Sequence, residues 1–416
     1  MKKIFSLIIL LFYLTISIFY NTSLADDIDT DIYSNNIIEE NTLETSNSTF
    51  PSINSRSYVV IDRKTNSILV GKNEHIKKKM ASTTKIMTAI VIIENYNLDT
   101  IVEVSKKAAN TGGSRLGLKT GNKISIRDLL YGLMLCSGND AAVALAESTC
   151  ETVSNFAILM NEKAKTLGLN NTHFVTPHGL DADEHYTTAY ELALLSDYAL
   201  KNKTFLKIVG TKNYTISINN YPKNLNNTNE LLGNLNGVYG IKTGFTNGAN
   251  RCLVSACKRN DMDIICVVLG ADTKKFRTQD SIKLIEYTFN SFSYINIKEK
   301  IETEMLNIKK RITSFNIEKG TSQYVTFSYT TLENDIIPIE NNLISELKLH
   351  TYINTNLIAP VKNGSIIGSI DIYAGDILLY STNIITTNYI PKKNIIDYLY
   401  EFIKNYDKSL HRCLER

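Results

Sequence analysis

The apolar residues of the chain follow two different periods, and the change between them predicts a domain that contains both strands and helices. Residues 57–62 (SYVVID) are predicted to form a strand, and residues 67–70 to form the returning strand after a turn at 64–66. After Ala81 the apolar residues recur at intervals of three and four, which is the spacing of one helix face. The ordered part of the chain is therefore expected to begin, near Ile53, with a β-hairpin followed by a helix.

The same periods continue through the next two hundred residues. Ser125 precedes one helical run, and Asp128 stands three positions after it, as in an N-terminal cap. The predicted helices after the first are 125–135, 140–148, 153–167, 188–200 and 279–289, and the predicted strands are 237–243, 251–258 and 263–269. Strands, then helices, then strands indicate an α+β domain over residues 53–292.

From about Ile297 the pattern changes to short alternating runs. These runs predict a smaller all-β sandwich domain over residues 293–388, with strands at 324–329, 366–373 and 377–380. The final residues, 389–416, return to a helical pattern. Their apolar face is formed by Ile395, Leu399, Phe402 and Tyr406, beside several lysines.

Two placements remain open for this amphipathic tail helix. It can lie in a membrane surface, because its apolar face is accompanied by Lys392, Lys393, Lys404 and Lys408. It can equally pack on the β domain, because amphipathic faces usually meet protein. No run in the tail is long enough to cross a bilayer.

The N-terminus has the pattern of a secretory signal peptide. Lys2 and Lys3 precede an apolar stretch over residues 4–20, and Ser23-Leu24-Ala25 supplies small residues where a signal peptidase cleaves. We expect cleavage after Ala25, with an uncleaved membrane anchor as the alternative. Either way the protein is expected to be extracytoplasmic: secreted, in the cell wall or on the outer face of the cytoplasmic membrane. Residues 26–52 are acidic and polar, which predicts a disordered linker.

Composition excludes several classes of function. The 416 residues carry 45 basic and 42 acidic side chains and a net charge of +3, so nothing indicates a nucleic-acid partner. The six cysteines show no CxxC and no zinc-ligand spacing, and the sequence selects no disulfide pair. We therefore expect no metal and no cofactor.

Candidate chemistry begins with Ser-x-x-Lys, which occurs three times, at 82–85, 255–258 and 345–348. A serine hydroxyl needs a base beside it, and residues three apart share a helix face. Residues 82–85 begin a helical run, where unpaired backbone N–H groups can hold an oxyanion. Residues 251–258 alternate as a strand, so Ser255 and Lys258 would point to opposite faces. The first pair is therefore preferred.

A lysine that acts as a base must be neutral, and a nearby cation favours that form. Lys-Thr-Gly occurs twice. We interpret residues 119–121 as a turn, whereas residues 242–244 end an apolar strand that suits a cleft wall. There Lys242 and Thr243 can bind a substrate carboxylate, and Gly244 lets the substrate backbone come close. A third segment, Ser137-Gly138-Asn139, lies between two predicted helices. Taken alone, it fits an ordinary loop with a helix N-cap.

Taken together, in this order, the three motifs resemble those of the penicillin-binding, active-serine D-Ala-D-Ala carboxypeptidases of low molecular mass. The resemblance runs from Ile53 to Thr387 and includes an appended β domain. It rests on ASTTKIMTA (81–89), CSGNDAA (136–142), THFVTPHGLD (172–181) and GIKTGFTNGANRCLVSA (240–256). It implies a β-lactamase/transpeptidase-like catalytic domain. Class A β-lactamases are similar at two motifs, but usually carry Ser-Asp-Asn and a Glu-x-x-Leu-Asn loop, which this chain lacks.

The resemblance also implies a mechanism. Ser82 attacks the carbonyl of the penultimate D-Ala of a peptidoglycan pentapeptide, and Lys85 takes its proton. Ser137 passes a proton to the leaving D-Ala. Water then releases the acyl-enzyme, and β-lactams acylate the same serine. The sequence does not identify the residue that activates this water.

The same resemblance assigns the substrate contacts. Asn139 holds the substrate amide, while Lys242 and Thr243 bind the terminal carboxylate and disfavour the charged form of Lys85. Arg277 matches an arginine near the carboxylate site. The backbone N–H groups of Ser82 and Phe245 form the oxyanion hole. Relatives often have His at the position of Phe245, but only the backbone is needed.

Three alternatives compete with this interpretation. His173, His178 and His185 lie close together, but they lack the HExxH spacing of a metal-dependent peptidase and fit a loop at the substrate rim better. A β-lactamase-type hydrolase would turn penicillin over rapidly. A non-catalytic peptidoglycan-binding homologue would keep the cleft without turnover.

Overall fold

The computed structural model of the chain describes residues 49–414, with side chains described up to residue 406. The predicted signal peptide, 1–25, and residues 26–48 of the predicted linker lie outside the described residues. The described chain divides into two compact units, the first ending at Ser291 and the second beginning at Phe292. Near its start, Phe50 stacks on Tyr58 and meets Tyr287 edge to face.

The first unit is built on one antiparallel sheet of five strands in the order β2-β1-β9-β8-β7. The hairpin predicted at the start of the chain is present as β1 and β2. The strand β1 also pairs with β9, so the beginning and the end of this unit lie side by side. The strands are β1 (Ser57–Asp62), β2 (Ile68–Lys72), β7 (Val238–Thr246), β8 (Asn250–Arg259) and β9 (Met262–Ala271).

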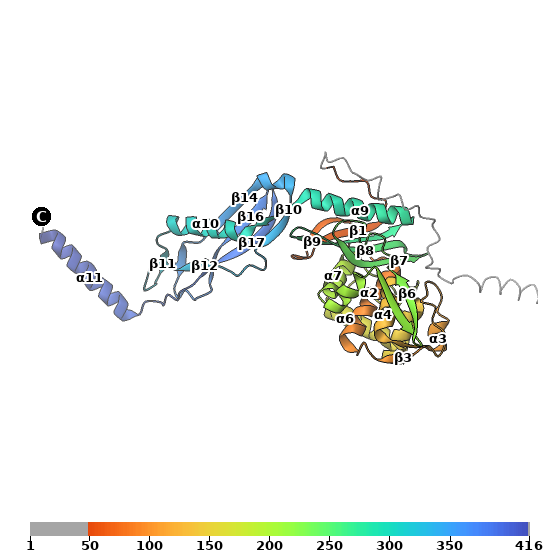
Figure 1. Cartoon of the computed structure of the whole chain (residues 1–416). Helices are drawn as coiled ribbons and strands as arrows, with labels where there is room; N and C mark the ends of the chain where they lie inside the picture. The colour runs from red at the N-terminus through yellow and green to blue at the C-terminus, as the bar shows by residue number, and fades with distance from the viewer. Residues whose placement is uncertain (1–48, 415–416) are drawn as a thin grey trace, which may run out of the picture. The chain divides into compact units, whose positions relative to one another are not determined.

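Helices cover both faces of this sheet. Figure 1 shows α9 along one face, with α2, α4, α6 and α7 gathered on the other. In α2 the first eight residues are all buried, so this helix runs through the interior of the unit. The helices of this unit are η2 (Ala81–Thr84, a 3-10 turn), α2 (Lys85–Asn95), α3 (Lys106–Ala109), α4 (Ile126–Leu135), α5 (Asn139–Cys150), α6 (Val153–Thr166), α7 (Ala189–Leu200), α8 (Lys203–Val209) and α9 (Lys274–Ser291).

The cap that the sequence predicts at the start of α4 is confirmed. The side chain of Ser125 accepts a hydrogen bond from the Asp128 N–H at the start of α4. Thr188 caps α7 in the same way, accepting from the Glu191 N–H. The last helix, α9, is longer than the pattern indicates, since it begins at Lys274.

Two small antiparallel strand pairs complete the first unit, the second of them a hairpin, and the sequence analysis overlooked both. One pairs β3 (Ile101–Glu103) with β4 (Lys123–Ser125), and the other pairs β5 (Asn213–Ile218) with β6 (Tyr221–Asn226). The turn of the second hairpin contains two asparagines with positive φ, 50° and 65°. Asparagine tolerates this conformation better than most residues, so Asn-Asn was the available signal.

The second unit is mainly β, and its largest sheet has the order β12-β17-β16-β14. Its runs of alternating residues form strands, but the first begins only at Phe327 and the last continues to Thr386. Its strands are β10 (Phe292–Asn296), β11 (Asn316–Glu318), β12 (Phe327–Tyr329), β13 (Ile336–Glu340), β14 (Leu347–Ile353), β15 (Asn356–Ile358), β16 (Ile366–Ala374) and β17 (Ile377–Thr386), with a 3-10 turn, η3 (Asn341–Glu346).

This unit is not entirely β, which corrects the sequence-based expectation. The helix α10 (Ile297–Arg311) occupies the segment where alternating runs were expected to begin. Its buried residues, Ile297, Ile301, Met305 and Ile308, recur at helical spacing and join the core of this unit. The many charged residues of α10 face outward and obscured this stripe in the sequence.

The tail forms α11 (Ile395–Leu414), where its periodicity predicts a helix. Its apolar side chains are exposed: Ile395 at 86%, Ile396 at 72% and Phe402 at 69%. None of the helices in the described part of the chain has the length and apolarity needed to span a bilayer.

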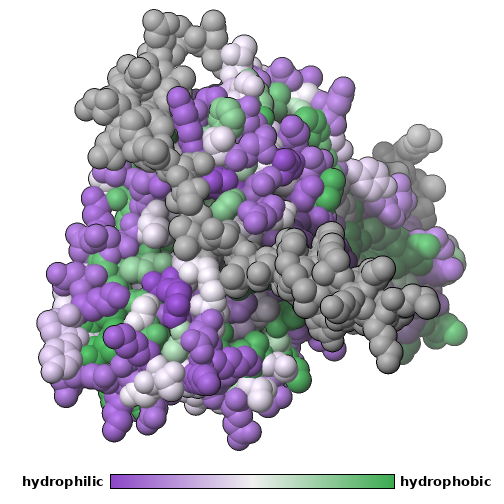
Figure 2. Space-filling view, turned by 90° about the vertical axis from the view of Figure 1, so that its right-hand side faces the viewer, coloured by the Kyte–Doolittle hydropathy of each residue, from purple (hydrophilic) through white to green (hydrophobic). Residues whose placement is uncertain are grey.

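Each unit has its own apolar core, and the two cores share no residue. The larger core contains most of α2, α4 and α5 together with the inner positions of the central sheet. Most apolar side chains of the first unit lie in this core, and the face shown in Figure 2 is mostly hydrophilic, with scattered hydrophobic patches.

Candidate active site

Ser82 and Lys85 lie together at the start of α2, as their spacing predicts. The Lys85 Nζ is 2.6 Å from the Ser82 Oγ. Ser82 stands in the turn η2 and is 3% exposed, and Lys85 is the first residue of α2 and is fully buried. A buried amine in contact with a hydroxyl is the arrangement that an activated serine needs.

The amine of Lys85 also contacts Asn139 and the loop at His178. It donates to Asn139 Oδ1 at 2.7 Å and to the backbone carbonyl of His178 at 2.8 Å. The Asn139 amide group also donates from Nδ2 to the Gly112 carbonyl at 2.8 Å. In this structure, therefore, Asn139 holds the catalytic-site lysine, and its predicted contact with substrate stays a prediction.

Ser137 precedes Asn139 by two residues and is held in an unusual backbone conformation. Its φ is +59°, although it is not glycine, and its side chain is nearly buried. Residues in this region are strained unless their surroundings fix them. The neighbouring Asp140 carboxylate supplies such fixation, since it accepts from the backbone N–H groups of Leu116, Gly117 and Leu118.

The Lys-Thr-Gly segment of β7 packs against the nucleophile turn. A Cβ at Gly244 would lie only 3.0 Å from the Ser82 N. Glycine, which has no Cβ, allows the two backbones to approach this closely. Lys242 is 1% exposed, and its Nζ donates to the Thr243 carbonyl at 2.9 Å. Its charge also acts on Cys136, the residue before Ser137. All three motifs thus converge.

Two more contacts shape the nucleophile turn. Gly179 has φ +89°, and a Cβ there would lie 1.9 Å from the Ala81 carbonyl oxygen. His185 lies beneath the same turn, with its Nε2 2.8 Å from the Thr84 Oγ1. The loop that contains both residues therefore fixes the backbone around Ser82.

The three histidines are each engaged separately, which gives no support to the metal-dependent alternative. His173 Nδ1 is 2.5 Å from the Glu184 carbonyl, and His178 Nδ1 accepts from the Leu180 N–H. His185 Nδ1 accepts from the Val175 N–H at 2.9 Å. Burial lowers the pKa of His178 to about 3.

The other copies of the two motifs are not sites of this kind. Ser255 is buried in β8 while Lys258 is exposed, so the predicted separation onto opposite faces is present. Ser345 and Lys348 are both exposed in the second unit. The first Lys-Thr-Gly, at 119–121, forms the turn before β4.

Phe245 and Arg277 complete the predicted set. The Phe245 ring lies under the Arg251 guanidinium, 4.1 Å away, so its side chain is engaged beside the sheet. Arg277 is 3% exposed in the first turns of α9 and forms a short ion pair with Glu230. No contact between Arg277 and the side chains of Ser82 or Lys85 is present among the described residues.

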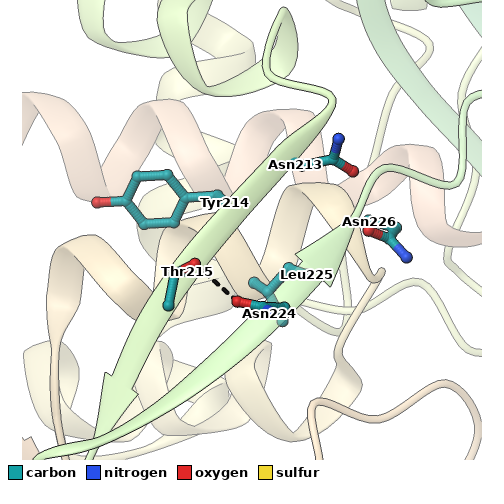
Figure 3. Close-up of a pocket in the computed structure, with 6 residues that line it drawn as sticks. All are labelled: Asn213, Tyr214, Thr215, Asn224, Leu225 and Asn226. Atoms are coloured by element: carbon teal, nitrogen blue, oxygen red, sulfur yellow. Dashed lines mark hydrogen bonds between the residues drawn. The ribbon is translucent and has the colours of Figure 1, made fainter.

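A shallow pocket of about 420 Å³ lies on the β5–β6 hairpin (Figure 3). Thr215 donates to Asn224 across the strand pair at 2.7 Å. The pocket is lined by Asn213, Tyr214, Thr215, Asn224, Leu225 and Asn226, and none of them is a predicted site residue. The convergence of the three motifs, rather than this pocket, marks the candidate site.

Sequence reasoning missed several residues that support the site. Asp181 ties down the β7–β8 turn, accepting from Thr246 Oγ1 and the Gly248 N–H. Thr228 lies 2.9 Å from the Thr243 hydroxyl, and Glu230 pairs with Arg277. Hydrophobic periodicity gives no signal for contacts between loops. The only sequence signal was the glycine and the aspartate of the HGLD segment, which are typical of a tight, hydrogen-bonded loop.

Comparison with known proteins gives a consistent result. The sequence model of the D-alanyl-D-alanine carboxypeptidase family, peptidase family S11, matches residues 44–273. D-alanyl-D-alanine carboxypeptidase DacF of Bacillus subtilis is 30% identical over 321 residues, covering 76% of this chain and 80% of that protein. The D-alanyl-D-alanine carboxypeptidase of Streptomyces sp. K15 is 35% identical over 260 residues, covering 58% of this chain and 89% of its own length.

Solved structures agree. Penicillin-binding protein 5 from Haemophilus influenzae superposes with a TM-score of 0.66 at 28% identity, covering 83% of this chain and 99% of that structure. The fold and the site thus define a transpeptidase-like hydrolase. The chain belongs to the D-alanyl-D-alanine carboxypeptidase family, peptidase family S11, which confirms the family and the α+β fold that the sequence predicts.

Proposed function

We propose that this chain is a serine-type D-Ala-D-Ala carboxypeptidase. It removes the terminal D-Ala from peptidoglycan stem peptides through an acyl-enzyme on Ser82, and penicillins acylate the same serine. The observation that carries the proposal is the position of the Lys85 Nζ, 2.6 Å from the Ser82 Oγ and 2.7 Å from Asn139 Oδ1. Family membership supports it independently.

Lys85 acts as a base in its neutral form. A neutral amine has two N–H donors and one lone pair. Asn139 Oδ1 and the His178 carbonyl accept from these two donors, and the third hydrogen bond of Nζ points to the Ser82 Oγ. In the neutral amine a lone pair takes that third position and can accept the proton of the Ser82 hydroxyl. Complete burial favours this uncharged form. Lys85 is thus the general base for acylation.

The remaining roles follow from position. Ser137, fixed beside Asn139, returns a proton to the nitrogen of the leaving D-Ala. Lys242 and Thr243 bind the terminal carboxylate, and Arg277 contributes to that subsite. The backbone N–H groups of Ser82 and Phe245 stabilise the oxyanion, since β7 packs against η2 at Gly244.

Release of D-Ala from a pentapeptide tests the reaction. We expect the wild type to release one D-Ala per peptide and Ser82→Ala to lose at least about a thousandfold in rate, because the nucleophile is absent. Rapid hydrolysis of penicillin without a lasting adduct would instead indicate a β-lactamase. Binding of peptide with no D-Ala release would indicate a non-catalytic homologue.

We further propose that the protein acts outside the cytoplasm and touches the membrane through α11. The exposed apolar side chains of α11 and the adjacent Lys404 suit an anionic lipid surface. Removal of residues 395–416 is expected to abolish sedimentation with anionic vesicles. Equal sedimentation of both forms would contradict this placement.

A further inference from the structure

The carboxylate subsite is bordered by a short segment that the reaction does not itself require. Three side-chain atoms there are buried without a hydrogen-bond partner among the described residues: Asn229 Nδ2, Glu230 Oε2 and Arg277 Nε. Buried polar atoms are usually satisfied, so a local group of three calls for an explanation. The group surrounds one ion pair, between Glu230 and Arg277.

This ion pair is largely removed from water. Arg277 is 3% exposed, and the Glu230 side chain is 17% exposed. Glu230 Oε1 also accepts from Thr278 Oγ1 at 2.8 Å. Although burial opposes its ionisation, Arg277 and these hydrogen bonds hold the pKa of Glu230 below its usual range. Glu230 is therefore a carboxylate at neutral pH and cancels the charge of Arg277.

The pair lies next to the residues that are proposed to bind the substrate carboxylate. Two residues before Glu230, the Thr228 hydroxyl is 2.9 Å from the Thr243 hydroxyl. On the other side, the charge of Arg277 acts on Cys252, which is the partner of Gly244 across β7 and β8. The segment 228–230 thus contacts both Thr243 and Arg277.

We propose that Glu230 is a positioning and specificity-determining residue of the carboxylate subsite. It orients Arg277 and neutralises its charge, so that attraction for a terminal carboxylate depends mainly on Lys242 and Thr243. This inference rests on the proposed function, because it concerns the same substrate carboxylate.

The physical consequence is a moderated affinity for the terminal carboxylate. A carboxylate that approaches Arg277 meets a charge already paired with a carboxylate, and the two anions repel each other. Because the repulsion disappears when Glu230 is neutral, removal of its charge should tighten the binding of acid-terminated ligands. Ligands that end in an uncharged amide should be unaffected. Moderated binding also favours release of D-Ala, which carries the same carboxylate.

The test compares two dipeptide ligands by calorimetry: N-acetyl-D-Ala-D-Ala and its C-terminal amide. All proteins carry Ser82→Ala so that no turnover occurs. Glu230→Gln keeps a hydrogen-bond acceptor for Arg277 but removes the charge. We expect Glu230→Gln to lower the Kd of the acid at least about threefold, a change that calorimetry resolves. The Kd of the amide should stay unchanged.

Two controls separate charge from structure. Thr278→Val removes a hydrogen bond to Glu230 but keeps its charge, so the acid-to-amide ratio should not change. In an Arg277→Gln background the Glu230 carboxylate is no longer compensated, so Glu230→Gln should lower the Kd of the acid by at least the same factor. Thermal unfolding of each variant reports whether the fold is retained.

The outcomes are distinct. Equal effects on acid and amide, or weaker binding of the acid by Glu230→Gln, would overturn the role of Glu230 while leaving the proposed function intact. Failure of the Ser82→Ala protein to bind either dipeptide would overturn the proposed function as well. Loss of the Glu230→Gln effect without Arg277 would show that repulsion by the Glu230 carboxylate is not its origin.

Discussion

Around Ser82, close backbone contacts decide which positions must be glycine. Gly179 is the tightest of these, because its Cβ would collide with the Ala81 carbonyl and its φ is positive. Gly168 offers a matched control, since it also has a positive φ, +73°, but nothing lies within 4 Å of its Cβ position. The two glycines separate steric contact from backbone strain.

Gly179→Ala is expected to destabilise the protein by about 3 kcal/mol or more, because the turn η2 must move. Penicillin acylation should fall with it. Gly168→Ala should cost about 1 kcal/mol, from backbone strain alone, and leave acylation unchanged. Urea unfolding and acylation rates measure both. Equal effects of the two substitutions would contradict the close approach.

His185 makes the stability of the catalytic unit dependent on pH. Burial, followed by the charge of His173, lowers the pKa of His185 to about 4. The ordinary value of about 6.5 applies to the unfolded chain, so the unfolded chain binds the proton more readily. This contribution to stability is therefore complete above pH 6.5 and is lost as the pH falls toward 4.

Between pH 7.5 and pH 5.5 we expect His185 to remove about 1 kcal/mol from the free energy of unfolding. His185→Gln should reduce the decline over this range by that amount, although it is less stable at pH 7.5. Urea unfolding at the two pH values measures the difference. An unchanged decline in the variant would show that His185 does not stay neutral in the folded protein.

At the residue scale, sequence reasoning identified the chemistry but not its support. Spacing and helix geometry selected Ser82 and Lys85 from three Ser-x-x-Lys pairs, and the structure shows their contact. The apolar strand before Lys-Thr-Gly singled out Lys242, and the family resemblance supplied the role of Asn139. Glu230, Thr228 and His185 could not be found, because their contacts join loops that are distant in sequence and carry no period.

At the scale of elements, strongly periodic segments were predictable and short or charged ones were not. The strands β7, β8 and β9 and the capped helix α4 follow from their patterns. The helix α10 was missed because its four buried residues are diluted by charged ones. Its cap was readable, since Asn296 accepts from the Glu299 N–H.

The turn between β7 and β8 provides a prediction at this scale. Asp181 accepts from Thr246 and Gly248 and so fixes the end of the strand that carries Phe245. Asp181→Asn places an N–H group against a donor, and we expect acylation to slow about tenfold, with a loss of roughly 1–2 kcal/mol in stability.

Asp99→Asn is the control for this substitution. Asp99 is 74% exposed and pairs with Arg127 at the surface, so its loss should change stability by less than about 0.5 kcal/mol. Its acylation rate should equal that of the wild type. If Asp181→Asn behaves like Asp99→Asn, the turn does not support the oxyanion hole.

At the scale of the whole molecule, the two units have separate cores, and the site lies in the first. Every predicted site residue lies before Ser291. The Streptomyces relative matches over only 58% of this chain while covering 89% of its own length, so a family member exists with little beyond the catalytic unit. The second unit is therefore not expected to take part in the chemistry.

A chain that ends at Ser291 should fold and react with penicillin within about threefold of the full-length rate, because no residue of the first core is removed. Acylation with a fluorescent penicillin measures this directly. Loss of acylation, with the fold retained by circular dichroism, would show that the second unit contributes to the site.

The most direct test of the central claim is the identity of the acylated residue. Trypsin cleavage after Lys79 and Lys85 releases Met80–Lys85 as the peptide MASTTK. After brief exposure to penicillin, mass spectrometry should find the adduct on this peptide, at Ser82. An adduct on a peptide that contains Ser255 or Ser345, or on none while D-Ala is still released, would contradict the account.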